Sequence, residues 1–262
     1  MPSSDPLTLF EEPSGLRQPV LILAFSGWND AAESATTAAR YLGQIWPSTD
    51  FSLSRDSALD RDLIVGVAME PHLRWRTYCG AVLDLAKRAD ASLVLTLGAL
   101  LAEVPHTRPV RLVGGTQDPA LAATLGIRPS RYEGPTGIVG VLNTICREAG
   151  VPTASLWANV PHYVSGVENP KAALALVRRV LTLLGAEADL SDLMEATQQF
   201  ERNLEEVVGQ NPKIAEYVRK LEGRPPDEED EPAAATGDEL PPSADLVAEI
   251  EQFLRQQRPD TS

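Results

Sequence analysis

Residues capable of chemistry follow several apolar runs of this sequence, at the points where those runs end. Asp30 closes a polar stretch after Val20 to Phe25, Glu70 follows Leu63 to Met69, and His162 follows Ala154 to Val160. In an open parallel sheet, ligand and partner sites lie outside the carboxyl ends of the strands. We therefore predict one polar rim that forms a pocket or a partner surface. Its candidate residues are Trp28, Asn29, Asp30, Glu70, Arg74, His106, Thr107, Arg108, Glu133, Thr136, His162 and Tyr163.

The residue types on this rim allow several kinds of chemistry. His72, His106 and His162 with a carboxylate can ligate zinc in principle, but their spacing matches no compact zinc motif. We therefore expect hydrogen-bonded structural histidines and no metal. Glu33, Glu70 and Glu133 can serve as acid and base only if they lie close together, which the sequence does not determine. No catalytic residue is assigned, and enzymatic activity is left open with a preference against it.

Glycine-rich segments offer only weak signs of a nucleotide site. The segment 134–137 precedes a predicted helix, whose N-terminus attracts anions. It lacks the Lys-Ser/Thr pair of a P-loop and the GxGxxG spacing of a dinucleotide site. The segment 114–116 is interpreted as a further glycine turn, and no GxSxG nucleophile motif occurs. We expect no cofactor.

The apolar periodicity predicts the elements that must position the rim. Continuous apolar runs, typical of strands buried on both faces, alternate with segments of helical spacing. This alternation indicates an α/β fold with a mainly parallel sheet. Residues 98–103 are ambiguous between a strand extension and a helical turn. Strands are expected at 20–25, 62–69, 92–97, 111–113 and 154–160, and helices at 31–42, 73–88, 138–149 and 171–184.

The aromatic and cysteine residues are expected to be structural. Trp28, Trp75, Trp157 and Tyr163 lie near element ends and can line a pocket, although burial in the core is the favoured interpretation. The two cysteines, Cys79 and Cys146, fall in predicted helices and have no CxxC spacing, so buried reduced thiols are expected.

Composition and charge exclude several classes of partner. The chain has 262 residues, 43% hydrophobic and 23% charged, with a formal net charge of -14. Because phosphate binding needs a basic surface, we expect neither nucleic acid nor an anionic membrane as partner. The N-terminal residues lack the basic and apolar regions of a signal peptide, and no apolar run approaches a membrane span. A cytoplasmic location is therefore expected.

The pattern changes after residue 186, which sets the expected domain boundaries. Residues 1–186 are predicted to form the α/β domain, and 187–222, with helical spacing and no strand, a helical hairpin. Residues 223–242 contain seven acidic residues and one arginine, which indicates a flexible acidic linker. Residues 243–258 place Leu246, Ile250 and Phe253 on one face of an amphipathic helix. That face is expected to fold back on the same chain or to dock on another.

Five motifs together resemble the proteasome assembly chaperone 2 family, in its actinobacterial branch. The resemblance covers about residues 20–221. The motifs, in order, are Gly27-Trp28-Asn29-Asp30-Ala31, Glu70-Pro71 with Arg74 to Thr77, Thr96 to Leu101 running to Val104-Pro105-His106-Thr107-Arg108-Pro109, Arg131 to Ile138, and Trp157 to Tyr163.

This resemblance implies a three-layer α/β/α body similar to nucleoside phosphorylases, with a helical C-terminal appendage and assembly into homo-oligomers, for which a trimer is favoured. In eukaryotic and archaeal relatives the function is to assist proteasome assembly, and the docking tag is a C-terminal hydrophobic-Tyr-any residue tripeptide. This sequence ends Asp260-Thr261-Ser262, which does not match that tag.

The sequence is compatible with two functions. The first is a non-catalytic, oligomeric interaction protein that binds a protein partner through the rim and the C-terminal helices. The alternative is a protein or enzyme that binds a small anionic or nucleoside-like molecule. His106, Arg108, Glu133 and His162 would then surround the ligand.

Overall fold

One twisted sheet forms the centre of the molecule in the computed structural model, which describes residues 13, 15–45, 48–49, 53–54, 60–129 and 137–225. In this part of the chain eight strands follow the order β2-β3-β4-β1-β5-β8-β6-β7. The strands are β1 (Val20–Ser26), β2 (Ser48–Thr49), β3 (Leu53–Ser54), β4 (Leu63–Met69), β5 (Leu93–Ala102), β6 (Leu112–Thr116), β7 (Arg128–Pro129) and β8 (Thr153–Pro161).

The four central strands, β4, β1, β5 and β8, are all parallel. The apolar runs of β1 and β5 are buried on both faces, as the sequence predicts: β1 is buried from Val20 to Phe25 and β5 from Leu93 to Ala99. β4 differs from that prediction, because Val67 and Met69 are exposed. Because these strands point the same way, their carboxyl ends meet at one edge of the sheet, which we call the rim. β6 runs antiparallel to β8, and β3 runs antiparallel to β4.

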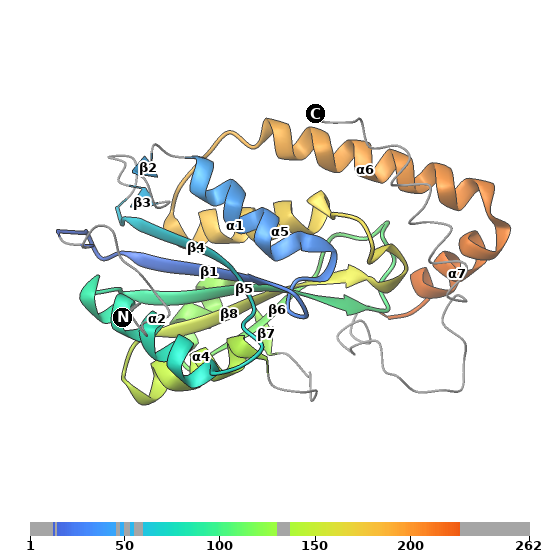
Figure 1. The fold of residues 1–262 in the computed structure, drawn as a ribbon. Helices are drawn as coiled ribbons and strands as arrows, with labels where there is room; N and C mark the ends of the chain where they lie inside the picture. The colour runs from blue at the N-terminus through green and yellow to red at the C-terminus, as the bar shows by residue number, and fades with distance from the viewer. Residues whose placement is uncertain are drawn as a thin grey trace, which may run out of the picture.

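Helices cover both faces of the sheet, so the predicted three-layer α/β/α fold is confirmed (Figure 1). One face packs against α1 (Ser34–Ile45) and α5 (Pro170–Leu184), with the short α3 (Pro119–Leu125) beside α5. The other face packs against α2 (Trp75–Arg88) and α4 (Ile138–Glu148). Cys79 of α2 and Cys146 of α4 are buried, unpaired thiols in that second layer, as expected.

The helix expected at 31–42 begins three residues later, at Ser34. Ala31–Glu33 form a 3-10 turn in which Ala32 and Glu33 have positive φ angles of 53° and 51°. The Asp30 carboxylate accepts hydrogen bonds from the backbone N–H groups of Ala35 and Thr36 at 2.7 and 3.2 Å. Asp30 therefore stabilises the N-terminal turn of α1 from outside the helix.

Two strands also differ from the sequence prediction. β5 continues to Ala102, which settles the ambiguous residues 98–103 as a strand extension. The strand expected at 111–113 extends to Thr116, so segment 114–116 is not a turn. Position 114 requires a glycine because the backbone of β8 lies too close for a side chain: a Cβ on Gly114 would lie 2.1 Å from the Ser155 carbonyl oxygen.

Two further helices complete the described chain. α6 (Ser191–Gln210) crosses the α1/α5 layer, and α7 (Pro212–Glu222) turns back to the carboxyl ends of the strands (Figure 1). We call this pair the hairpin. Asn211 caps α7 by accepting from the N–H of Lys213 at 3.1 Å. The hairpin shares a small core with the segment that follows β8, formed by Tyr163, Val164, Val167, Phe200, Leu204, Val207, Ile214, Val218 and Leu221.

Several sequence predictions concern residues outside the described ranges. Glu133, Thr136 and most of segment 134–137 belong to this group, as do residues 226–242 of the acidic linker and the amphipathic helix at 243–258. They stay predictions.

Candidate functional site

The rim has two unlike halves in the part of the chain that the structure describes. At the ends of β5 and β8 the hairpin packs onto the predicted site residues and buries many of them. At the ends of β1 and β4 the rim lies open, with large apolar side chains in solvent. The predicted rim residues are thus divided between a structural contact and an accessible surface.

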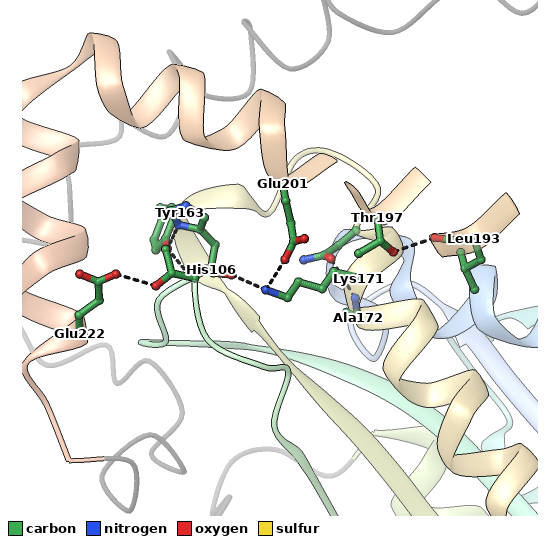
Figure 2. A network of polar contacts seen from close by, with 10 residues as sticks. His106, Tyr163, Lys171, Ala172, Leu193, Thr197, Glu201 and Glu222 are labelled. Carbon is green, nitrogen blue, oxygen red and sulfur yellow. Dashed lines mark hydrogen bonds and ion pairs between the residues drawn. The ribbon is translucent and has the colours of Figure 1, made fainter. Parts of the chain in front are cut away.

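His106 and Tyr163 form the centre of the covered half (Figure 2). The Tyr163 hydroxyl accepts the backbone N–H of His106 at 2.8 Å and lies 2.8 Å from His106 Nδ1. Both contacts are satisfied if the hydroxyl hydrogen is donated to Nδ1, which requires a neutral imidazole with its proton on Nε2. Both side chains are buried, at 6% and 1% exposure.

His162 makes the corresponding connection to α7. Its Nδ1 lies 3.3 Å from the Ala102 carbonyl oxygen, and its Nε2 lies 3.2 Å from the Tyr217 hydroxyl. The carbonyl can only accept, so Nδ1 carries the proton and Nε2 accepts from Tyr217. The rings of His162, Tyr163 and Tyr217 also meet edge to face. Both histidines are therefore hydrogen-bonded structural residues.

Polar contacts at the edge of this cluster hold the hairpin in place. Thr107 donates to Glu222 Oε1 at 2.6 Å, and Arg108 donates to the Glu222 backbone carbonyl. Lys171 Nζ bridges two elements, because it donates to the His106 carbonyl at 2.6 Å and pairs with Glu201 of α6 at 2.7 Å (Figure 2). The predicted residues His106, Thr107, Arg108, His162 and Tyr163 are thus brought together, but around the hairpin.

Burial sets the electrostatics of the covered half. Burial, with a smaller effect of Lys171, lowers the pKa of His106 to about 4. Burial also lowers the pKa of His162 and raises the pKa of Tyr217 to about 12. These groups are consequently neutral at pH 7, which is compatible with the hydrogen bonds described above.

The open half exposes apolar side chains at the ends of β1 and β4. Trp28 is 53% exposed, Met69 75% and Leu73 80%. Ser26 pairs with Met69 in the sheet, so β1 and β4 end side by side, and Trp28 and Leu73 follow these two strand ends. We call Trp28, Met69 and Leu73 the apolar corner. The expectation that Trp28 lies in the core is wrong, because Trp28 follows the end of β1 and turns outward; Tyr163 is in the core as expected.

Asn29 lies beneath this corner with unsatisfied polar atoms. Its side chain is 1% exposed, and neither its Oδ1 nor its Nδ2 has a hydrogen-bond partner within the described residues. The amide packs against the residue that precedes α4, where a Cβ on Gly137 would lie 2.6 Å from Asn29 Oδ1. A buried unpaired amide costs about 1–3 kcal/mol, so this one needs a structural or functional explanation.

Glu70 occupies the N-terminus of α4. Its Oε1 accepts from the Ile138 N–H at 3.0 Å, and Gly137 supplies no side-chain cap. Glu70 thus fills the place that an anionic ligand would take at a helix N-terminus. Arg74, exposed and with a positive φ of 58°, precedes α2 on the same side. His72 is exposed in the same loop, unlike the buried His106 and the half-buried His162.

The comparisons with known proteins agree with the motifs. The model of the PAC2 family matches residues 43–208, more than half of the chain. The chain belongs to the PAC2 family. The resemblance drawn from the motifs is thereby confirmed, whereas no curated protein matches this chain.

Solved structures support this family assignment. A PAC2 family protein from Streptomyces avermitilis is 37% identical, with a TM-score of 0.65, over 76% of this chain and 99% of that one. A proteasome-assembly chaperone homologue from Mycobacterium tuberculosis is also 37% identical, with a TM-score of 0.68 over the same shares. An archaeal proteasome activator from Pyrococcus furiosus, 19% identical over 76% of this chain and 97% of that one, shares the fold with a TM-score of 0.59.

Sequence reasoning missed several residues of this PAC2 protein's rim. Lys171, Glu201 and Tyr217 reach the histidines from α5, α6 and α7, across separations that no local motif reveals. Met69 ends the apolar run before the Glu70-Pro71 motif, and Leu73 follows that motif; the apolar character of Leu73 in a polar stretch is the available signal. No described helix has the length and apolarity that crossing a membrane would require.

Proposed function

We propose that this PAC2 protein is a non-catalytic, oligomeric interaction protein that acts as a proteasome-assembly-type chaperone in the cytoplasm. The apolar corner is its partner-binding surface, and a trimer is the favoured assembly. The observation that carries the proposal is the exposure of Trp28, Met69 and Leu73 at and just beyond the adjacent ends of β1 and β4. Large aromatic and Met side chains are enriched at the cores of protein interfaces.

The chemistry of the rim supports binding over catalysis. Of the groups suited to proton transfer, His106 is hydrogen-bonded to Tyr163, His162 to Tyr217 of the hairpin, and Glu70 to the start of α4. The exposed polar residues His72, Arg74 and Arg76 flank the apolar corner and form a polar edge beside it. An apolar centre with a polar edge is the usual arrangement of a protein interface.

The proposal predicts that Leu73→Asp weakens partner binding. The substitution puts a charge in the centre of the corner, and Leu73 is 80% exposed, so the fold is unaffected. Binding to purified actinobacterial proteasome subunits, measured by biolayer interferometry, should weaken at least tenfold. Ala196→Asp, on the exposed surface of α6, is the matched control and should bind normally. If wild-type protein binds no subunit, or both variants bind alike, the proposal is wrong.

A second candidate function is binding of a small nucleoside-like molecule, favoured by the unpaired Asn29 amide. An amide offers two donors and one acceptor oxygen, which suits a base edge once the buried Asn29 side chain is uncovered, and the exposed Trp28 ring offers a stacking surface. The Glu70 carboxylate at the start of α4 disfavours phosphates there, so nucleosides should bind in preference to nucleotides.

A thermal-shift series tests this candidate. We expect a nucleoside to raise the melting temperature of the wild-type protein by several degrees and to leave Asn29→Leu unchanged, whereas the corresponding monophosphate has a smaller effect. Asn203→Leu, on α6, is the control substitution and should keep the response. Equal shifts in the wild type and Asn29→Leu would rule the site out.

A further inference from the structure

A groove of about 670 Å³ runs along the hairpin side of the molecule, away from the apolar corner. Its walls come from α5, α6 and the segment that leads into β6. Apolar side chains line part of it, namely Val110, Leu112, Leu174, Ala175 and Met194, and polar or charged ones line the rest, among them Lys171, Arg178, Arg179, Thr197 and Glu201. Met194, on α6, is 39% exposed there. Such a groove between helices is the usual receptor for one amphipathic helix.

The described chain ends beside this groove. Arg108 donates to the backbone carbonyls of Glu222 and, at 3.1 Å, of Arg224, the second-to-last described residue. Pro109, which follows Arg108 in the chain, lines the groove. Residues 226–242 lead from this point to segment 243–258, and at ~3.3 Å per residue they can span about 55 Å. Any part of the groove is therefore within reach of that segment.

The sequence of segment 243–258 matches the groove in chemistry. Its apolar residues, Leu246, Val247, Ile250, Phe253 and Leu254, fall on one helical face. Asp245 and Glu249 make its first half acidic, and Glu251 follows directly. Among the residues lining the groove, α5 contributes the exposed Arg178 and the half-buried Arg179. Apolar and charged surfaces are thus complementary.

We propose that residues 243–258 dock as an amphipathic helix in the α5/α6 groove of their own chain. A tethered segment has an effective concentration in the millimolar range, which favours its own groove over that of a second molecule. Docking covers Met194 and removes the apolar face of 243–258 from water. The inference does not depend on the apolar corner or on its partner.

Cysteine accessibility in the full-length protein tests the proposal. Met194→Cys places a thiol in the groove, and Ala196→Cys places one on the opposite side of α6 as a reference. The native cysteines do not interfere, since both are buried and burial raises the pKa of each thiol to about 11. Each protein is reacted with a thiol reagent, and the rate is measured.

We expect the thiol of Met194→Cys to react at least tenfold more slowly than that of Ala196→Cys, and an added Phe253→Asp substitution to remove that difference. Gln252→Asp, on the polar face of the same segment, should leave the protection intact. Equal rates for the two positions in otherwise wild-type protein would overturn the proposal. Protection that disappears on dilution would also overturn it, because the occupant would then be a second copy.

Discussion

Acidification from pH 7 to pH 4 is expected to lower the free energy of unfolding by about 3 kcal/mol through His106 alone. The pKa of His106 falls from 6.5 to about 4 in the folded protein, chiefly because the ring is buried. Between these two pH values His106 is therefore protonated in the unfolded chain and neutral in the folded chain. This contribution to stability is fully present above pH 6.5 and is lost between pH 6.5 and 4, at about 1.4 kcal/mol per pH unit.

Chemical denaturation at a series of pH values measures this effect. In His106→Gln the slope of stability against pH in that window should fall by about one proton, whatever the variant's absolute stability. His72→Gln removes an exposed histidine and should keep the wild-type slope. Burial raises the pKa of Asp30, which gives the slope of stability against pH a contribution of opposite sign. That contribution is the same in the wild type and in both variants, so it cancels when their slopes are compared. An unchanged slope in His106→Gln would show that His106 is not buried as described.

Gly114→Ala is expected to destabilise the protein by about 3 kcal/mol or more. The new methyl group would lie 2.1 Å from the carbonyl oxygen of Ser155 and 3.1 Å from its carbonyl carbon. These are backbone atoms of β8, so relief requires separating β6 from β8 instead of turning a side chain. Urea denaturation should show a lower midpoint.

Gly115→Ala is the matched control for this prediction. Its Cβ would meet only the Ser155 hydroxyl oxygen, at an ordinary contact distance of 3.8 Å. We expect its free energy of unfolding to change by less than about 1 kcal/mol. Equal losses in the two variants would mean that the cost comes from replacing glycine in this strand and not from the contact with β8.

The sequence was informative wherever local pattern decides structure. Continuous apolar runs place the four parallel strands, and Asn169 with Pro170 marks the start of α5, where Asn169 accepts from the Ala172 N–H at 3.0 Å. The common direction of those strands then assembles the rim. The beginning of α1 was misplaced because the Asp30 carboxylate caps the helix across an intervening 3-10 turn, bonding first to the N–H of Ala35.

The local sequence pattern does not predict that the rim is divided into a covered half and an open half. The motif around His106 is as polar as the motif around Trp28. Packing of the hairpin near one motif and not near the other separates the covered half of the rim from the open half. The same holds for Gly114, whose adjacency to Ser155 depends on the antiparallel return of β6 along β8. Contacts between distant segments decide these cases, and a single sequence does not reveal them.

The packing of the hairpin also imposes an order on synthesis. Tyr163, Val164 and Val167 leave the ribosome well before Ile214, Val218 and Leu221, which cover them. A nascent chain that has completed β8 therefore presents an uncovered apolar surface at the end of its sheet until α7 emerges. Chains that terminate before α7 is complete keep that surface, and such exposed apolar surface is what directs incomplete chains to aggregation or to chaperones.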